Sequence, residues 1–179
     1  MPELTLESDI VYTGKILNLR VEKVSLPNGR ETVREIVDHP PSVCAIISTA
    51  SNKIIMVKQF RKSVEKELWE LPAGKLEPGE DIETTLRREM EEEAGLIGGH
   101  IEKLCEFYVS PGFCTEKMHL FHIKGGKIDK AKPQFDEIIK VAEFEPEEIL
   151  KMIREGEIED GKTIAGILLW GDMYQTLED

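Results

Sequence analysis

Residues 74–96 have the sequence GKLEPGEDIETTLRREMEEEAGL, and this stretch decides how the chain of 179 residues is interpreted. Its second half predicts a helix over residues 81–94, because apolar residues recur at every fourth position and Gly95 follows to end the helix. These apolar residues are Ile82, Leu86, Met90 and Ala94. At about 100° of rotation per residue they share one arc of the helix surface, which we expect to face a hydrophobic core.

Three glutamates of the same helix lie at or beside that apolar arc. On the same rotation Glu93 falls inside the arc and Glu89 borders it, with Glu92 beside them. A carboxylate at the edge of a core is costly unless something compensates it, and neighbouring carboxylates repel one another. A hard divalent cation with oxygen ligands is the commonest compensator, and Mg²⁺ is often shared with substrate phosphates. The pattern therefore favours a metal site for phosphate chemistry over the alternative, an ordinary solvated helix face.

The spacing in this stretch resembles the Nudix box, G-x5-E-x7-R-E-U-x-E-E-x-G-U, in which U is a bulky apolar residue. The fixed positions are all filled, by Gly74, Glu80, Arg88, Glu89, Met90, Glu92, Glu93, Gly95 and Leu96. The resemblance implies a Nudix hydrolase, which folds as an α/β/α sandwich. Such an enzyme hydrolyses a nucleoside diphosphate linked to another moiety, and it uses Mg²⁺ or Mn²⁺.

The resemblance also implies roles for individual residues. The implied metal ligands are Glu89, Glu92, Glu93 and the carbonyl oxygen of Ala73, which directly precedes the box. The implied structural residues, which hold the loop and the helix together, are Gly74, Glu80, Arg88 and Gly95. Mg²⁺ is the expected cofactor, with Mn²⁺ or another divalent cation as the alternative.

Features outside the box resemble the ADP-ribose pyrophosphatase branch of this family. Pro111 lies 16 residues after Gly95, in the segment SPGFCTEKMHLF, where that branch has a characteristic proline. The tail EIEDGKTIAGILLW is similar as well. The substrate contacts implied by the resemblance are Arg34, Glu35, Arg61 and Pro111. The implied reaction converts ADP-ribose to AMP and ribose 5-phosphate.

The general base is expected at one of two places. The branch usually supplies a late glutamate from the loop before the penultimate strand, and here this loop has the sequence KPQFDEIIKV. We favour Glu137 over Asp136 because Glu137 sits directly before the strand. A box glutamate, Glu92, is the alternative group that would take the proton from the attacking water.

Two other functions stay open, because the box gives the reaction and not the compound. One is a Nudix hydrolase of another nucleoside diphosphate sugar or of a dinucleotide. The other is a catalytically silent Nudix domain that binds a ligand. The intact box argues against the silent domain, which has no need to keep clustered carboxylates.

We expect the chain to divide at Pro40-Pro41. Residues 9–39 alternate in the manner of two or three antiparallel strands, with a turn at Pro27-Asn28-Gly29 between two of them, which predicts a small β unit over residues 1–40. In the ADP-ribose pyrophosphatase branch this unit contacts substrate and forms a domain-swapped homodimer, with sites built from both chains. The resemblance thus implies a homodimer that exchanges its N-terminal units.

Residues 41–179 form the expected catalytic domain, of α/β class with an α+β mixed sheet. The nearly continuous apolar run at residues 43–49 predicts a buried central strand. Further strands are expected at residues 53–61, 68–71, 101–109, 117–124 and 138–144. Besides the carboxylate helix, helices are expected at residues 146–155 and 163–177.

The net charge excludes two classes of partner. The chain has 23 Lys and Arg residues against 35 Asp and Glu residues, a formal charge of −12. Neither nucleic acid nor a membrane is therefore expected to bind, and a small nucleoside diphosphate derivative is the expected partner. Residues 77–93 and 143–160 carry −6 each, and the remainder is neutral. The first window contains the candidate metal site, and the second is interpreted as a solvated helix and turn.

The cysteines favour a cytoplasmic location. Cys44, Cys105 and Cys114 are odd in number and lack CxxC spacing, as expected of reduced thiols. The first ten residues, MPELTLESDI, lack the basic and then apolar pattern of a signal peptide. The longest apolar runs are too short to span a membrane.

Overall fold

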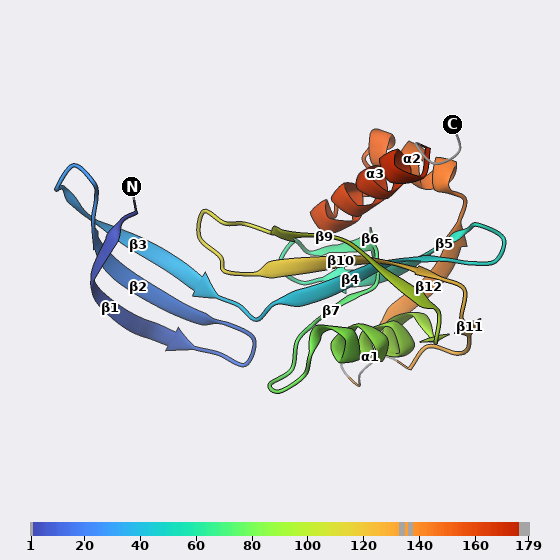
Figure 1. Ribbon diagram of the computed structural model, residues 1–179, viewed down its shortest axis with the longest axis horizontal. Coiled ribbons are helices and arrows are strands. Elements are labelled where there is room, and N and C mark those ends of the chain that lie inside the picture. The colour runs from blue at the N-terminus through green and yellow to red at the C-terminus, as the bar shows by residue number, and fades with distance from the viewer. Residues whose placement is uncertain (1, 133–134, 136–137, 176–179) are drawn as a thin grey trace. The chain divides into compact units, whose positions relative to one another are not determined.

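The computed structural model describes residues 2–132, 135 and 138–175, and these form two units (Figure 1). The first unit joins the residues up to 42 with residues 107–118. The second holds residues 43–106 and the described residues from 119 onward. The division at Pro40-Pro41 into residues 1–40 and 41–179 stays a prediction. In the structure, the unit of the N-terminal strands also includes residues 107–118.

The first unit contains an antiparallel sheet of three strands. In spatial order these are β1 (Leu4–Thr13), β2 (Asn18–Ser25) and β3 (Glu31–Asp38). The expected turn at Pro27-Asn28-Gly29 connects β2 to β3, and the amide of Gly29 donates to the carbonyl of Leu26 at 2.9 Å. Gly29 has a φ of 80°, a left-handed conformation that costs glycine little.

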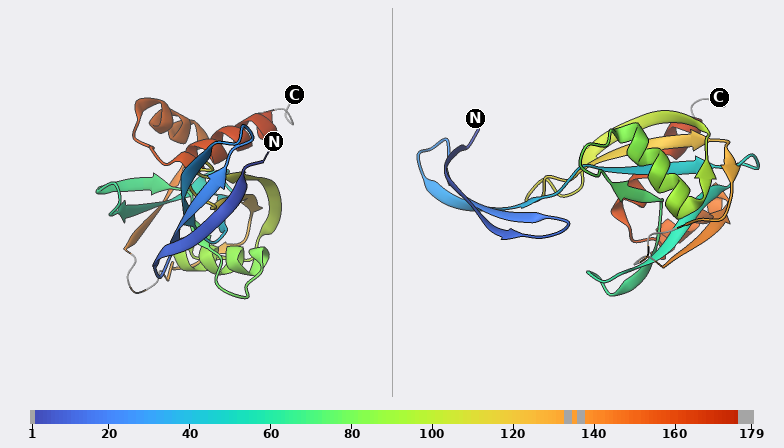
Figure 2. Two further views of the ribbon diagram at one scale, coloured as in Figure 1. Left: turned by 90° about the vertical axis from the view of Figure 1, so that its left-hand side faces the viewer. Right: turned by 90° about the horizontal axis from the view of Figure 1, so that it is seen from below.

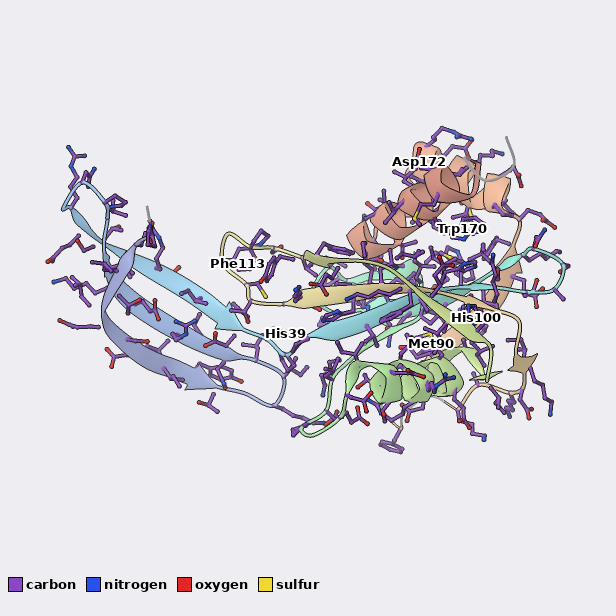
Figure 3. All side chains as sticks on the ribbon, viewed as in Figure 1. His39, Met90, His100, Phe113, Trp170 and Asp172 are labelled. Atoms are coloured by element: carbon purple, nitrogen blue, oxygen red, sulfur yellow. The ribbon has the colours of Figure 1, made fainter. Side chains whose placement is uncertain are left out.

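The end of β3 is hydrogen-bonded to the loop of residues 107–118. The amide of Val37 donates to the carbonyl of Phe113 at 2.7 Å, and the carbonyl of Val37 accepts from the amide of Thr115 at 3.0 Å. The amide of His39 donates to Oγ1 of Thr115 at 2.9 Å, and that hydroxyl donates to the carbonyl of His39 at 3.2 Å. His39 and Phe113 are labelled in Figure 3. These four hydrogen bonds explain why the loop groups with the N-terminal strands.

The second unit is built on a larger sheet. Its strands are β4 (Ser42–Ser48), β5 (Ile54–Arg61), β6 (Lys66–Glu70), β7 (Ala73–Lys75), β9 (His100–Tyr108), β10 (Lys117–Lys124) and β12 (Ile139–Phe144). The order is β12-β5-β4-β10-β9, with β6 paired to β5 and β7 paired to β4. The short strands β8 (Leu96–Ile97) and β11 (Lys127–Ile128) pair separately. Within this arrangement β4 is central and entirely buried.

Helices cover both faces of the larger sheet. In Figure 1, α1 (Ile82–Ala94) lies on one face, and α2 (Pro146–Glu155) and α3 (Gly161–Gln175) lie on the other. The view from below in Figure 2 shows α1 crossing the strands. Leu86 and Met90 of α1 pack in one cluster with Val43 and Ile55. Because β4 is covered on both sides, its residues are apolar without alternation.

The expected α/β sandwich with an N-terminal antiparallel β unit is confirmed. The carboxylate helix begins at Ile82, one residue later than expected, because Asp81 is the N-cap and accepts from the amide of Thr84 at 3.0 Å. The last helix begins earlier, at Gly161. Strand β7 was not expected. Within the described residues, no helix combines the length and apolar composition that a membrane crossing requires.

Candidate functional site

The backbone before α1 approaches the helix closely because residue 74 is a glycine. An ideal Cβ at Gly74 would lie 1.9 Å from the carboxyl carbon of Glu89 and 2.1 Å from its Oε1. These separations are far shorter than van der Waals contact, so a side chain here would displace the carboxylate. Gly74 therefore sets the distance between strand β7 and the buried carboxylate of α1.

Arg88 and Glu80 tie the loop before α1 to the helix itself. Nε of Arg88 donates to Oε1 of Glu80 and Nη2 donates to Oε2, both at 2.9 Å. The hydroxyl of Thr85 donates to the same carboxylate at 2.9 Å. The hydrogen bond from Arg88 is the main cause that lowers the pKa of Glu80 to about 2. Glu80 is thus held ionised, and its bidentate contact fixes the loop.

The three glutamates of α1 sit at the inner edge of the helix. Glu89 is 7% exposed and Glu93 is 4% exposed, while Glu92 is half-buried. Nη1 of Arg88 donates to Glu89 at 2.8 Å and to Glu92 at 3.4 Å. Oε2 of Glu93 accepts from the amide of Ala73 at 2.9 Å. The structure therefore brings Glu89 and Glu93 to Ala73 and Gly74, where the sequence predicts the start of the site.

The residues present fit a hard divalent cation by their chemistry. Glu89, Glu92 and Glu93 offer only oxygen donors, as does the carbonyl of Ala73, and Mg²⁺ prefers such donors. The cradle at Gly74, which a Cβ would fill, keeps Glu89 against the backbone. In the described residues no three acidic, histidine or cysteine side chains converge as a ready metal cluster, and Arg88 takes up two of the carboxylates. The metal ligand set stays a prediction.

Helix α1 ends at Gly95, against the chain that follows β11. Gly95 has a φ of 69°, and a Cβ there would lie 2.0 Å from the carbonyl oxygen of Asp129. The amide of Lys132 donates to the carbonyl of Glu92 at 2.8 Å, so this segment closes over the last turn of the helix. The favoured base, Glu137, lies outside the described residues, and its place in the site stays a prediction.

Arg61, at the end of β5, is held by Glu70 at the end of β6. Nε and Nη2 of Arg61 donate to Oε1 and Oε2 of Glu70, both at 2.7 Å. The hydrogen bond to Glu70 is the main cause that raises the pKa of Arg61, and the charges of Glu93 and Asp160 contribute to the same shift. Arg61 therefore lies within electrostatic reach of Glu93 of α1.

The other predicted substrate contacts belong to the first unit. Arg34 and Glu35 are neighbours on β3, so their side chains project to opposite faces of the sheet. Arg34 forms an ion pair with Glu3, with Nη2 and Oε1 separated by 2.7 Å. Pro111 is exposed in the loop that joins β9 to β10. Their roles as substrate contacts stay predictions.

Sequence reasoning missed the partners of Arg61. Glu70 is 2% exposed, and it contacts Lys162 as well as Arg61. Asp160 lies in the window interpreted as solvated, but it is partly buried and accepts from the amide and hydroxyl of Thr163 at 3.0 and 2.6 Å. The available signals were an acidic residue between apolar neighbours in LWEL and the EDGKT pattern at a helix start.

Two family models together match residues 3–166 of the chain. Residues 38–166 match the model of the NUDIX domain, and residues 3–37 match that of the nucleoside diphosphate sugar hydrolase N-terminal domain. The ADP-ribose pyrophosphatase of Bacillus subtilis is 42% identical over 169 residues, which cover 93% of this chain and 91% of that protein. A methanol dehydrogenase activator of Bacillus methanolicus is also 42% identical, over 92% of this chain and 90% of that protein.

A solved structure shows the same fold. The crystal structure of an ADP compounds hydrolase superposes with a TM-score of 0.87 and covers 99% of this chain and 96% of that one. The two sequences are 14% identical, so this likeness concerns the fold alone.

Replacing Glu80 with glutamine should destabilise the protein most near neutral pH. The pKa of Glu80 is lowered from its ordinary 4.5 to about 2 in the folded state. Its ionised form therefore contributes stability above the ordinary pKa, and this contribution is lost as the pH falls toward 2. Urea unfolding of the wild type and of Glu80→Gln should give a free-energy difference that is largest above about pH 5 and shrinks below it.

Glu83→Gln is the matched control on the same helix. Glu83 forms an exposed ion pair with Arg87, at 2.7 Å, and exposed pairs contribute little to stability. The free-energy difference between the wild type and Glu80→Gln is the deciding quantity. A difference that stays constant from pH 7 to pH 3, or that matches the difference for the control, would contradict a stabilising ion pair between Arg88 and Glu80.

Proposed function

The chain belongs to the Nudix hydrolase family, and from this premise we propose that it hydrolyses ADP-ribose to AMP and ribose 5-phosphate with a divalent cation. The observation that carries the proposal is the placement of Glu89 and Glu93 against residues 73–75. Two buried carboxylates one helical turn apart are costly to keep ionised, and a bound cation would compensate their charge. The choice of ADP-ribose is supported by the 42% identity to the pyrophosphatase of Bacillus subtilis.

In this proposal Glu89, Glu92, Glu93 and the carbonyl of Ala73 hold Mg²⁺, or Mn²⁺ in its place. When bound, the cation neutralises charge on the phosphate oxygens and lowers the pKa of water. The box residues Gly74, Glu80, Arg88 and Gly95 keep the loop and the helix in the arrangement described above. The support for this assignment is the oxygen-only chemistry of the donor set.

Arg61 binds a phosphate of the substrate through charge-assisted hydrogen bonds in this proposal. Its side chain is 41% exposed, and Glu70 occupies only Nε and Nη2, so Nη1 points away from that contact. Arg34, Glu35 and Pro111 of the first unit supply further substrate contacts. Glu137 or Glu92 takes the proton from the attacking water.

We further propose a homodimer that exchanges its first units, in a cytoplasmic protein. Support for the dimer comes from large apolar side chains left exposed on β1 and β3, which include Leu4, Ile10, Tyr12 and Val33. A second copy of the chain would remove this surface from water. Support for the location is that the three cysteines form no disulfide in the described structure.

A second candidate function is hydrolysis of another nucleoside diphosphate sugar or of a dinucleotide. It is favoured by the match of residues 3–37 to the nucleoside diphosphate sugar hydrolase N-terminal domain, which names a wider substrate class. The methanol dehydrogenase activator, at the same identity as the pyrophosphatase, also leaves the compound open.

A substrate panel tests the proposed function directly. Purified protein is incubated with Mg²⁺ and ADP-ribose, ADP-glucose, GDP-mannose, NADH or diadenosine polyphosphates, and the released phosphomonoesters are measured with a coupled phosphatase. We expect the highest kcat/KM for ADP-ribose, with AMP and ribose 5-phosphate as products. A preference for GDP-mannose would overturn the choice of ADP-ribose, and hydrolysis of none would favour a silent ligand-binding domain.

Replacing Glu93 with glutamine should lower kcat by about a thousandfold or more at saturating Mg²⁺, because a proposed metal ligand and its charge are lost together. Glu91→Gln is the control, since Glu91 is exposed on the same helix and pairs only loosely with Lys132, at 3.6 Å. Near wild-type turnover of Glu93→Gln would overturn the metal assignment.

Light scattering tests the proposed dimer. At micromolar concentration the full chain should have twice the mass of its 20.3 kDa protomer. A single peak with the mass of the monomer at micromolar concentration would contradict a dimer that exchanges its first units.

A further inference from the structure

A cluster of alternating charges joins β5, β6 and the start of α3. Its members are Arg61, Glu70, Lys162 and Asp160. Lys162 donates from Nζ to Oε2 of Glu70 and to Oδ2 of Asp160, the latter at 3.0 Å. The side chain of Lys162 is 10% exposed and that of Glu70 is 2% exposed, so this contact is made largely out of water. The cluster contains two positive and two negative charges.

Lys162 balances carboxylates that Arg61 would otherwise face alone. Burial by itself would raise the pKa of Glu70, but the hydrogen bond from Arg61 and the charge of Lys162 hold it below its ordinary value. Glu70 is thus an anion shared between two cations. Without the charge of Lys162, the cluster would hold the single positive charge of Arg61 against the two negative charges of Glu70 and Asp160, and Arg61 would be more than offset.

The geometry of Arg61 leaves one edge for a ligand. Glu70 takes Nε and Nη2 in a bidentate contact, which fixes the plane of the guanidinium. Among the described residues, none forms a hydrogen bond with Nη1, and the side chain is 41% exposed. Arg61 is therefore oriented from the buried side and open on the other.

The same cluster also reaches the segment that contacts the glutamates of α1. The hydroxyl of Thr163 donates to Asp160 and accepts from the amide of Leu71, the latter at 2.8 Å. Two residues later the amide of Ala73 donates to Glu93 at 2.9 Å. The start of α3 thus anchors both Arg61 and the strand beside the candidate metal site.

We propose that Lys162 is a positioning residue for the phosphate groups of the substrate, acting through Arg61. Lys162 pairs with Glu70 and Asp160, so their negative charge does not cancel that of Arg61. Glu70 can then hold the guanidinium of Arg61 in one orientation while its positive charge acts on a bound phosphate. The inference rests on the proposed function, because it assigns part of the binding of a pyrophosphate-bearing substrate to a residue that does not touch it. A purely structural ion pair would affect folding and leave the affinity of the folded protein unchanged.

The test compares Lys162→Met with Lys66→Met in the full chain. Lys66 is the matched control, because its Nζ joins β6 to the residues before α3 through Glu159, at 2.8 Å, in a contact that is exposed to solvent. KM and kcat are measured for ADP-ribose at saturating Mg²⁺. We expect Lys162→Met to raise KM about tenfold and to change kcat by less than about threefold, as for a loss of ground-state binding. Lys66→Met should change neither.

A double-mutant cycle shows whether Lys162 acts through Arg61. In an Arg61→Gln background, Lys162→Met should no longer raise KM, since the group it positions is gone. The proposal would be overturned if Lys162→Met raised KM by the same factor in both backgrounds. It would also be overturned if Lys162→Met left KM unchanged in the wild-type background, whether or not kcat fell.

A charge-compensated variant keeps the proposal testable if Lys162→Met does not fold. Asp160→Asn keeps the N-cap of α3, since asparagine caps a helix as well as aspartate does, and it removes the carboxylate left unbalanced. The double variant Asp160→Asn/Lys162→Met should return KM to within about threefold of the wild type. A tenfold rise that persisted would overturn the charge argument.

Calorimetric titration with ADP-ribose in EDTA separates this inference from the proposed function. Under these conditions no turnover is expected, and Lys162→Met should weaken binding about tenfold relative to the wild type. Wild-type binding without hydrolysis in the panel would overturn the proposed function alone. Equal binding by Lys162→Met and the wild type would overturn this inference alone, and absence of wild-type binding would overturn both.

Discussion

The burial of two carboxylates side by side on α1 is the constraint on which the rest of the site depends. Glu89 and Glu93 are almost fully buried, one turn apart, on the helix whose neighbouring positions form the core. Ionised groups are costly to remove from water, so each needs a partner. Arg88 supplies one partner and the amide of Ala73 supplies another, while the missing side chain at Gly74 makes the approach possible. The loop, β7 and α1 are consequently specified together.

Local patterns in the sequence predict the parts of the fold that repeat with a short period. The four-residue spacing of apolar side chains locates α1 to within one residue, and the buried run of β4 follows from cover on both faces. The position of Glu89 and Glu93 at the core follows from the same rotation. The helical period does not predict the rotamer of a long side chain. It therefore does not show that Arg88 donates hydrogen bonds to Glu89 and Glu92.

Features that depend on distant segments escape prediction from local patterns. Strand β7 is three residues long, too short for any period to appear. Glu70 and Lys162 are separated by 92 positions, so neither one signals the other. The acidic window of residues 143–160 predicts a solvated position for Asp160, yet Asp160 caps α3 and pairs with Lys162. Tertiary pairing of charges, rather than the local density of acids, decides which of them are buried.

The hydrogen bonds between β3 and the loop of residues 107–118 have a consequence for protein engineering and for evolution. A chimera that took only the N-terminal strands from a relative would leave the loop paired with a foreign strand end. Val37 and His39 on one side, and Phe113 and Thr115 on the other, therefore form a transferable module that is discontinuous in the gene. Thr115 alone contributes a side chain to these bonds, so a recombinant that keeps its hydroxyl and places no proline at positions 37 and 39 can retain all four of them.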